Sequence, residues 1–362
     1  MKNSLRKRIK SLTAALRGER GESMSAKYSK LKRREIKELI QKEYDLKAYN
    51  MHEWDKNILF YTDKGDKVFK KVKKDESQIL FVASAYEHIR DRGFDNISMI
   101  CKTVDGKYYV KYNKNLFILQ NSVRGKYFTI ESEKDGEKAG RTLANFHKAA
   151  DCFIPVPGSR AKVDWGKWQD KAKIQSMRLK KFKDIAQEKP YKSKFDRLFL
   201  NNADELCSKM ESAYMLLQDS CYLKKVYQSM QTNQLCHKNF KKHSLLVMDD
   251  GEIFVSGVEN CGYDIRETDI VSLLESCLSK KNKKYASYVI KGYKEVLPLD
   301  KNSINIVKAL LLQPSKYYKV VNRYYGEKKG YNEFELMKSL ERSIRKEGRK
   351  EEILLKLEEV ME

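Results

Sequence analysis

The feature that most constrains this chain is a change of pattern at Gly125, where short strand-like runs give way to long helical ones. Before that point the chain alternates apolar runs with turn residues, which predicts strands at 58–62, 67–72, 108–112 and 116–123. The first two runs flank the turn DKGD and are typical of a β-hairpin. One long helical stretch, 76–91, interrupts the strands and ends before Gly93.

After Gly125 the apolar residues recur mainly at helical spacing. Helices are expected at 136–150, 169–188, 193–218, 219–230, 266–278, 282–295, 303–312 and 332–361, with an earlier one at 35–43. A β-rich interruption at 233–258 contains LLVMDDGEIFVSG, a hairpin around a DDG turn. This order is the layout of a kinase. We therefore predict an α+β, two-lobed, protein kinase-like fold, with a small antiparallel-sheet N-lobe (35–125) holding one long helix and a larger, mainly helical C-lobe (126–362) containing a β-hairpin.

Composition excludes several classes of protein. With 22 Tyr and 14 Phe, the chain of 362 residues can build a core, so long-range disorder is not expected. No apolar run approaches a membrane span, and the first residues lack the apolar stretch of a secretion signal. The seven cysteines form no CxxC pair, so the sequence predicts neither a zinc site nor a disulfide framework.

Charge is distributed unevenly along the chain. The formal net charge is +24, and residues 1–34 alone hold 12 Lys and Arg against two acids. Leu5, Ile9, Leu12 and Leu16 place a thin apolar stripe on this basic arm. The surplus favours polyanionic partners, whether nucleic acid, anionic membrane or acidic protein. The arm is expected to be either a solvated, partly helical tail or a contact for such a surface.

Several separate stretches carry a family resemblance. They are LCHKNFKKHSLL (235–246), SGVENCGYDIRETDIVSLL (256–274), TLANFHKAADCF (142–153), PVPGSRAKVDWGKW (155–168), KFDRLFL (194–200) and ALLLQPSKYYKVVNRYYGEKKGY (309–331). The chain resembles the aminoglycoside phosphotransferase and choline kinase superfamily, and within it the CotS-type spore coat proteins. The resemblance covers about 40 to 360 and leaves the basic arm uncovered.

The resemblance also marks the positions where this chain departs from a working kinase. Asn239 stands where the family has its catalytic Asp, and an amide cannot take a proton from a hydroxyl. Ser244 replaces the magnesium-binding Asn, and Gly257 replaces the magnesium-binding Asp. Lys238 replaces the glycine of the His-Gly-Asp segment. These positions are therefore expected to be degenerate and to hold no metal, with Glu259 as the one residue placed to rescue metal binding.

The N-terminal part of the sequence also has few of the features that bind ATP. By the same resemblance Lys70 is the strand lysine that holds ATP phosphates, and Glu87 is expected to be its helix partner, together forming a vestigial ATP site. The segment before Ile58, NMHEWDKN, lacks the glycines of a phosphate-covering loop. In the linker between the lobes, Arg124 stands where the family has an acid.

Six further residues invite a role. His237 and His147 are expected to pack or hydrogen-bond rather than to catalyse. Asp269 is expected to tie a helix start to the catalytic loop, and Asp264 belongs to the same family motif. Trp165 and Trp168 are either core residues or exposed anchors.

The resemblance and the substitutions together predict a non-catalytic kinase-fold protein, a structural or interaction component of the bacterial endospore coat. Its partners would then be other spore coat proteins, and its location the mother-cell cytoplasm followed by the coat. No cofactor is expected. One alternative is an active, ATP- and Mg-dependent phosphotransferase on a small hydroxyl or amine compound or a sugar, with an atypical site. A second is a basic module that binds anionic membrane or nucleic acid through residues 1–34.

Overall fold

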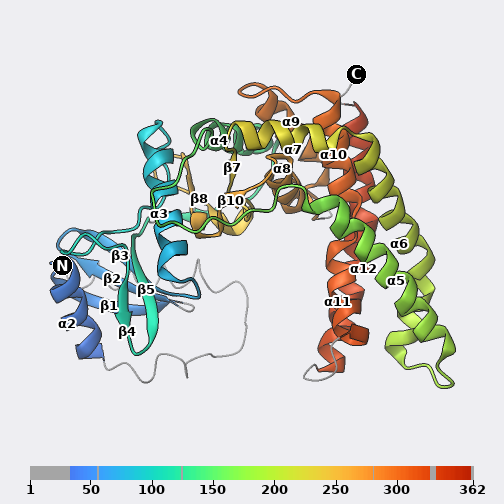
Figure 1. Ribbon diagram of the computed structural model, residues 1–362, viewed down its shortest axis with the longest axis horizontal. Helices are drawn as coiled ribbons and strands as arrows, with labels where there is room; N and C mark the ends of the chain where they lie inside the picture. Colours follow the sequence, from blue (N-terminus) through green and yellow to red (C-terminus); the bar gives the residue numbers. More distant parts are fainter. Residues whose placement is uncertain (1–32, 55–56, 124, 280, 327–331, 360–362) are drawn as a thin grey trace.

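The computed structural model describes residues 33–54, 57–123, 125–279, 281–326 and 332–359, and Figure 1 shows them as two lobes. The expectations for the basic arm up to residue 32 and for Arg124 lie outside the described residues. No helix in the described part is long and apolar enough to cross a bilayer.

The N-lobe is built on a five-stranded antiparallel sheet. Its strands are β1 (Ala48–Trp54), β2 (Asn57–Thr62), β3 (Gly65–Val72), β4 (Val110–Tyr112) and β5 (Asn115–Asn121). The order across the sheet is β1-β2-β3-β5-β4. Gly65 ends the tight turn between β2 and β3 with a φ of +86°, a conformation that glycine adopts without strain. Lys70 of β3 lies opposite Ile118 of β5, in the centre of the sheet.

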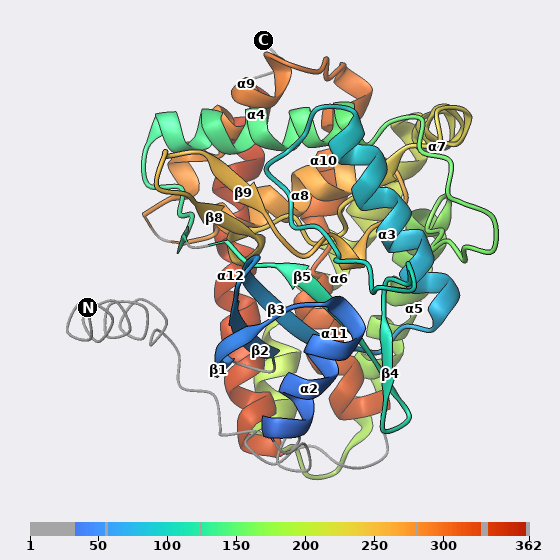
Figure 2. The same ribbon diagram turned by 90° about the vertical axis from the view of Figure 1, so that its left-hand side faces the viewer.

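Two helices cover the two faces of this sheet. α2 (Arg33–Tyr44) packs Ile36 and Ile40 against one face. α3 (Glu76–Asp91) begins with a capping box formed by Asp75 and Gln78 and packs on the other face, where Ile118 points. Figure 2 shows α3 lying beside the helical lobe as well as the sheet. Because α3 touches both lobes, it is the element through which the N-lobe positions the site.

The C-lobe consists mainly of helices. They are α4 (Glu133–Ala149), α5 (Lys167–Glu188), α6 (Lys194–Asp219), α7 (Tyr222–Gln231), α8 (Glu267–Leu274), α9 (Ala286–Lys294), α10 (Lys301–Leu312), α11 (Ser315–Gly326) and α12 (Glu333–Glu359). Its short strands are β6 (Lys126–Tyr127), β7 (Leu235–Cys236), β8 (Leu245–Val247), β9 (Ile253–Val255) and β10 (Gly262–Tyr263). The long helices α5, α6, α11 and α12 run side by side (Figure 1) around a core of their own.

Two glycines let α4 and α9 approach each other very closely. A β-carbon on Gly140 of α4 would lie 2.1 Å from the carbonyl oxygen of Val289, and one on Gly292 of α9 would lie 2.1 Å from that of Glu137. Backbone atoms cannot retreat from such a clash, so only glycine fits at either position. This contact fixes the two helices that carry His147 and Tyr293 toward the site.

The predicted fold class is confirmed, and most elements lie where their patterns placed them. The helix expected at 76–91 spans Glu76–Asp91, and the hairpins expected at 58–72 and within 233–258 are β2–β3 and β8–β9. The sequence patterns did not predict β1 or α11. They did not predict the short strands β6 and β10 either, whereas β7 lies within the β-rich stretch expected at 233–258.

Candidate functional site: a kinase-like catalytic loop

The loop that the resemblance marks as catalytic runs from β7 to the short 3₁₀ turn η1 (Lys242–Ser244). His237 opens it and is fully buried. Its Nε2–H donates to the carbonyl oxygen of Ser256 at 3.0 Å, and its Nδ1 accepts the backbone N–H of Asn239 at 3.2 Å, which assigns the tautomer. Burial lowers the pKa of His237 and keeps the ring neutral. Because both ring nitrogens are engaged with the backbone, His237 shapes the loop.

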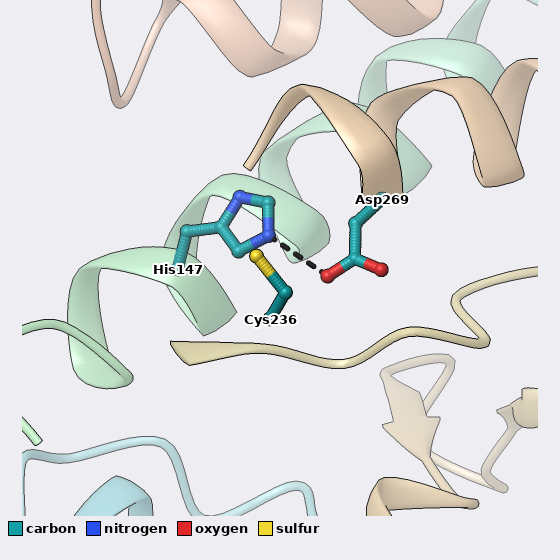
Figure 3. Close-up of side chains that lie close together, drawn as sticks. All are labelled: His147, Cys236 and Asp269. Atoms are coloured by element: carbon teal, nitrogen blue, oxygen red, sulfur yellow. Dashed lines mark hydrogen bonds and ion pairs between the residues drawn. The ribbon is translucent and has the colours of Figure 1, made fainter. Parts of the chain in front are cut away.

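Asp269 holds the same loop from behind. From the first turn of α8, its carboxylate accepts the backbone N–H of His237 at 2.6 Å and that of Lys238 at 2.8 Å. It also accepts the Nε2–H of His147 at 3.2 Å, the dashed contact in Figure 3, while Nδ1 of His147 accepts the hydroxyl of Tyr293 at 2.8 Å. Burial alone would raise the pKa of Asp269, but the hydrogen bonds from the His147 ring and from the backbone N–H of His237 help to outweigh it, and this pKa lies below its ordinary value. The expected tie between helix start and loop is therefore present.

The side chains of Figure 3 resemble a metal site in composition only. One ligand atom each from His147, Cys236 and Asp269 lies within 4.8 Å of the others, and all three residues are buried. The thiol of Cys236 donates to the carbonyl of Asp264 at 3.2 Å, and burial raises its pKa well above the ordinary value. A metal needs the thiolate, and the other two atoms are already paired with each other. The arrangement fits a hydrogen-bonded support better than a metal centre.

The three positions expected to be degenerate do meet in space. A β-carbon at Gly257 would lie 3.7 Å from Nδ2 of Asn239, 3.7 Å from Cβ of Ser244 and 3.7 Å from Cε1 of His237. These are ordinary contact distances, so the position has room for a side chain. The cradle of a phosphotransferase is therefore present in outline.

The donor groups at these positions do not fit magnesium. Gly257 offers no side chain, and Asn239 offers a neutral amide. The hydroxyl of Ser244 accepts the N–H of Lys241 at 3.0 Å and donates to the carbonyl of Asn239 or Lys241, both at 2.8 Å. Magnesium prefers a set of hard oxygen donors that includes at least one carboxylate. No carboxylate stands at any of the three positions.

Glu259, two residues after Gly257, is engaged across the lobe interface. It lies on the 3₁₀ turn η2 (Val258–Asn260), and its Oε1 is 3.5 Å from Nζ of Lys70 on β3. Its Oε2 accepts the hydroxyl of Tyr86 on α3 at 3.4 Å. Burial raises the pKa of a carboxyl in this place, but the charge of Lys70 and the hydrogen bonds that Glu259 accepts together outweigh burial, so the pKa of Glu259 is lowered and the group is ionised. Glu259 is thus paired with Lys70, the residue to which the family resemblance assigns ATP phosphates.

The predicted pairing of Lys70 with Glu87 does not form in this structure. Glu87 accepts the hydroxyl of Tyr108 at 2.8 Å and pairs with Lys102 at 2.9 Å. The reason is helical geometry, because consecutive residues of a helix point in directions about 100° apart. Tyr86, one residue earlier on α3, is the side chain that faces the lobe interface.

Lys238 fills the other side of the cradle. Its φ is +63°, the left-handed region that suits the glycine for which it substitutes. Its ammonium pairs with Asp264, which is fully buried, and with Asp164 at 3.1 Å. Burial disfavours the charged form of Lys238, but these carboxylates prevail and raise its pKa above the ordinary value. Sequence reasoning missed this pairing, because only the fold brings Asp164 next to Lys238.

The two tryptophans of the 155–168 loop are both partly buried. Trp165 stacks on Tyr263 with ring centroids 4.8 Å apart. Trp168 donates its indole N–H to Asp264 at 3.0 Å, and its ring lies 5.6 Å from the Lys238 ammonium. Trp165 is therefore a packing residue, while Trp168 belongs to the cluster around Lys238.

Comparisons with known proteins fit this geometry. Residues 37–357 match the model of the family described as "Spore coat putative kinase YutH". The chain belongs to that family. It is also 23% identical over 303 residues to "Spore coat protein S" of Bacillus subtilis (strain 168), which covers 83% of this chain and 86% of that protein.

Solved structures of kinases share the fold. An aminoglycoside phosphotransferase from Alicyclobacillus acidocaldarius superposes with a TM-score of 0.74 at 17% identity, covering 88% of this chain and 93% of that one. The AMP-bound spectinomycin phosphotransferase APH(9)-Ia superposes with a TM-score of 0.63 at 13% identity, covering 88% and 97%. At such identities the likeness establishes the kinase-like fold, and chemistry has to be argued from the site itself. The resemblance found in the sequence is confirmed.

Proposed function

We propose that this member of the spore coat family is a non-catalytic kinase-fold protein that acts as a structural or interaction component of the bacterial endospore coat. One observation carries the first half of this proposal. Asn239, Ser244 and Gly257 converge where a phosphotransferase places its proton acceptor and metal ligands, and together they offer no carboxylate.

Phosphoryl transfer depends on positioning and on neutralising the charge of the phosphates, mostly by metal ions. The residues present do not fit that metal. The two cations of the cradle also have internal partners. Lys70 is paired with Glu259, and Lys238 with Asp164 and Asp264. The chain's own carboxylates thus pair with the two lysines that an anionic ligand, such as a phosphate, would otherwise contact.

The second half of the proposal, a role in the coat, is supported by the family description and by the relative named as a spore coat protein. A fluorescent fusion of the full chain, imaged through sporulation, tests it. The expected signal passes from the mother-cell cytoplasm to a shell around the forespore and remains on released spores. A fusion that stays diffuse in the cytoplasm would contradict the coat role and leave the account of the catalytic loop untouched.

A working phosphotransferase is the competing function, and the position of Glu259 favours it. This carboxylate lies beside Lys70, where a metal-bound phosphate would be held, so it would need to leave Lys70 and Tyr86 to act as the metal ligand. Transfer of labelled γ-phosphate from ATP to a metabolite mixture measures this directly. The proposal predicts no transfer above that of a Lys70→Ala control. Transfer that is abolished by both Lys70→Ala and Glu259→Gln would establish the enzyme instead.

The basic module formed by residues 1–34 remains a separate hypothesis, because nearly all of this arm lies outside the described residues. Its prediction is a salt-sensitive association with anionic vesicles or nucleic acid that disappears when the arm is deleted.

A further inference from the structure

The segment that connects α4 to α5, residues 150–166, runs along the length of α3. We call this segment the strap. Both helices that flank it belong to the C-lobe, whereas α3 packs on the sheet of the N-lobe. The strap leaves the end of α4, crosses to α3 and returns to the start of α5. A loop of the C-lobe is therefore placed where it can hold a helix of the N-lobe.

The first part of the strap contacts the C-terminal half of α3. The ring N–H of His88, in the last turn of α3, donates to the backbone carbonyl of Asp151 at 2.9 Å. The ring of Phe153 packs edge to face with two rings of α3, its centroid 5.4 Å from that of Phe81 and 5.3 Å from that of His88. Phe153 and Phe81 are both buried. This end is therefore fastened by buried aromatic packing as well as by a hydrogen bond.

The later part of the strap contacts the start of α3. The backbone N–H of Arg160 donates to the backbone carbonyl of Ser77 at 3.0 Å, and its guanidinium pairs with Asp75, the N-cap of α3. Between the two ends, a β-carbon on Gly158 would lie 3.9 Å from the side chain of Leu80. Residue numbers along the strap thus rise as those along α3 fall. The strap therefore runs antiparallel to the helix, from its last turn to its N-cap.

Both ends of the strap are anchored in the C-lobe. At the first end, the N–H of Cys152 donates to the carbonyl of Thr232, just after α7, at 2.8 Å. At the second end, the N–H of Tyr263 on β10 donates to the carbonyl of Lys162 at 2.8 Å, and the N–H of Asp164 donates to the carbonyl of Tyr263 at 2.9 Å. These backbone hydrogen bonds tie the strap to the C-lobe independently of α3.

The C-lobe also holds α3 away from the strap. The hydroxyl of Tyr86 donates to Glu259 at 3.4 Å on the side of the cleft. The chain that leaves α3 pairs with β9, because the N–H of Val255 donates to the carbonyl of Asn96 at 2.8 Å and the N–H of Ser98 donates to that of Val255 at 3.4 Å. The helix is therefore held by the C-lobe at its start, along its length and just beyond its end.

We propose that the strap locks α3 to the C-lobe and so keeps the two lobes of this protein in one fixed arrangement. Hinge closure of two lobes around a ligand is common in kinases, and it requires the helix that corresponds to α3 to move relative to the C-lobe. Here such a motion would break the contacts of the strap. The pair of Arg160 with Asp75 is about half exposed and contributes little alone, so the lock depends on the whole set of contacts. The inference goes beyond the proposed function, because it concerns the motion of the lobes and not the chemistry of the cleft.

The test measures the distance between the lobes in the full-length protein. Keto-bearing amino acids replace Tyr49 on β1 and Met177 on α5, two exposed positions on opposite sides of the molecule (Figure 1), and carry a fluorescent donor and acceptor. Time-resolved energy transfer then reports the distribution of distances, with and without magnesium and ATP. For the wild type we expect one narrow distribution that the nucleotide does not shift.

Two variants release the strap, and a third is the matched control. Arg160→Asp places a like charge beside Asp75, and the double variant His88→Ala/Arg160→Asp also removes the hydrogen bond at the other end. The control is Arg141→Asp, which breaks an ion pair between α4 and α9, both within the C-lobe. Amide hydrogens of the strap should exchange at least about fivefold faster in the double variant, the ratio expected for losing one hydrogen bond of ordinary strength. Its distance distribution should broaden, whereas that of the control should match the wild type.

Several results would overturn the proposal. They are a broad or two-peaked distribution in the wild type, a shift of that distribution on adding magnesium and ATP, unchanged exchange of the strap in the double variant, faster exchange without any broadening, and equal broadening in the control. If the double variant loses its circular dichroism signal, Arg160→Asp alone repeats the comparison, and the wild-type distribution decides in either case. Saturable binding of magnesium and ATP without a change in distance would contradict the non-catalytic account and leave the strap standing.

Discussion

The two sides of the catalytic loop differ in how far their residues match the pattern of the kinase family. Behind the loop, Asp269 and His147 form a buried network in which each hydrogen-bonding group has a partner. In front of it, Asn239, Ser244 and Gly257 surround a point that lacks the carboxylates of a phosphotransferase. The proposed function therefore assigns the shape of the loop and its reactivity to different residues.

The largest effect is expected when the carboxylate of Asp269, which holds the backbone of the loop, is removed. Asp269→Asn replaces a buried carboxylate, which accepts two backbone N–H groups, by an amide that presents its own N–H₂ to one of them. We expect a loss of about 3–5 kcal/mol in the free energy of unfolding, measured by chemical denaturation. Asn239→Asp on the front side is the comparison, and we expect it to change stability by less than about 1 kcal/mol. Equal losses in the two variants would contradict the division.

The packing that carries His147 and Tyr293 to the loop gives the next largest effect. Gly140→Ala places a methyl group 2.1 Å from the carbonyl of Val289, so α4 and α9 must separate. The expected cost is about 2 kcal/mol, typical of an overpacked site. Gly348→Ala on α12 is the control, because nothing lies within 4 Å of the added carbon, and it should stabilise the helix by up to about 1 kcal/mol. If both substitutions stabilise the protein, the close contact between α4 and α9 is wrong.

The front side should tolerate a restored side chain at smaller cost. Gly257 has a φ of +85°, so any other residue is strained there, yet the surrounding atoms lie at ordinary contact distance. Gly257→Asp should lose about 1 kcal/mol, because aspartate tolerates the left-handed region better than most residues, and Gly257→Val should lose more. Thermal denaturation of the two variants measures the difference. A large loss of thermal stability in Gly257→Asp would contradict the open space around Gly257.

The smallest effect comes from the pair that joins the lobes. Glu259→Gln should cost about 1 kcal/mol at neutral pH, since it removes one charge from a partly buried pair. The folded state lowers the pKa of Glu259, so the ionised pair stabilises the protein above the ordinary glutamate value of 4.5 and is lost as the pH falls through the lowered value. The stability difference between wild type and variant should therefore shrink toward acidic pH. A difference that grows on acidification would contradict the ion pair.

The fold was predictable because its local signals agree with one another. Asp75 and Gln78 cap α3, Gly93 follows its end, and the alternating runs around DKGD form the β2–β3 hairpin. The missed elements have weaker signals. β1 is an edge strand in which polar and apolar residues do not alternate strictly. α11 follows Pro314 and is rich in tyrosine, and its buried and half-buried rings look alike in sequence.

The site was predictable only as a set of positions. The motif placed Asn239, Ser244 and Gly257 together, and the structure brings them together. Their neighbours depended on long-range geometry. The rotation of about 100° between consecutive residues of a helix decides that Tyr86, and not Glu87, faces the interface. Likewise, the contact of Lys238 with Asp164 joins residues 74 positions apart and has no local signature.

Calorimetric titration with magnesium and ATP tests the central claim most directly, with wild-type protein and the Glu259→Gln variant measured side by side. Because Lys70 is occupied by Glu259 and the cradle has no carboxylate free for magnesium, we predict no saturable heat for the wild type. Micromolar binding to the wild type that requires magnesium and disappears in Glu259→Gln would contradict the claim, since it would show Glu259 serving as a metal ligand in a working nucleotide site.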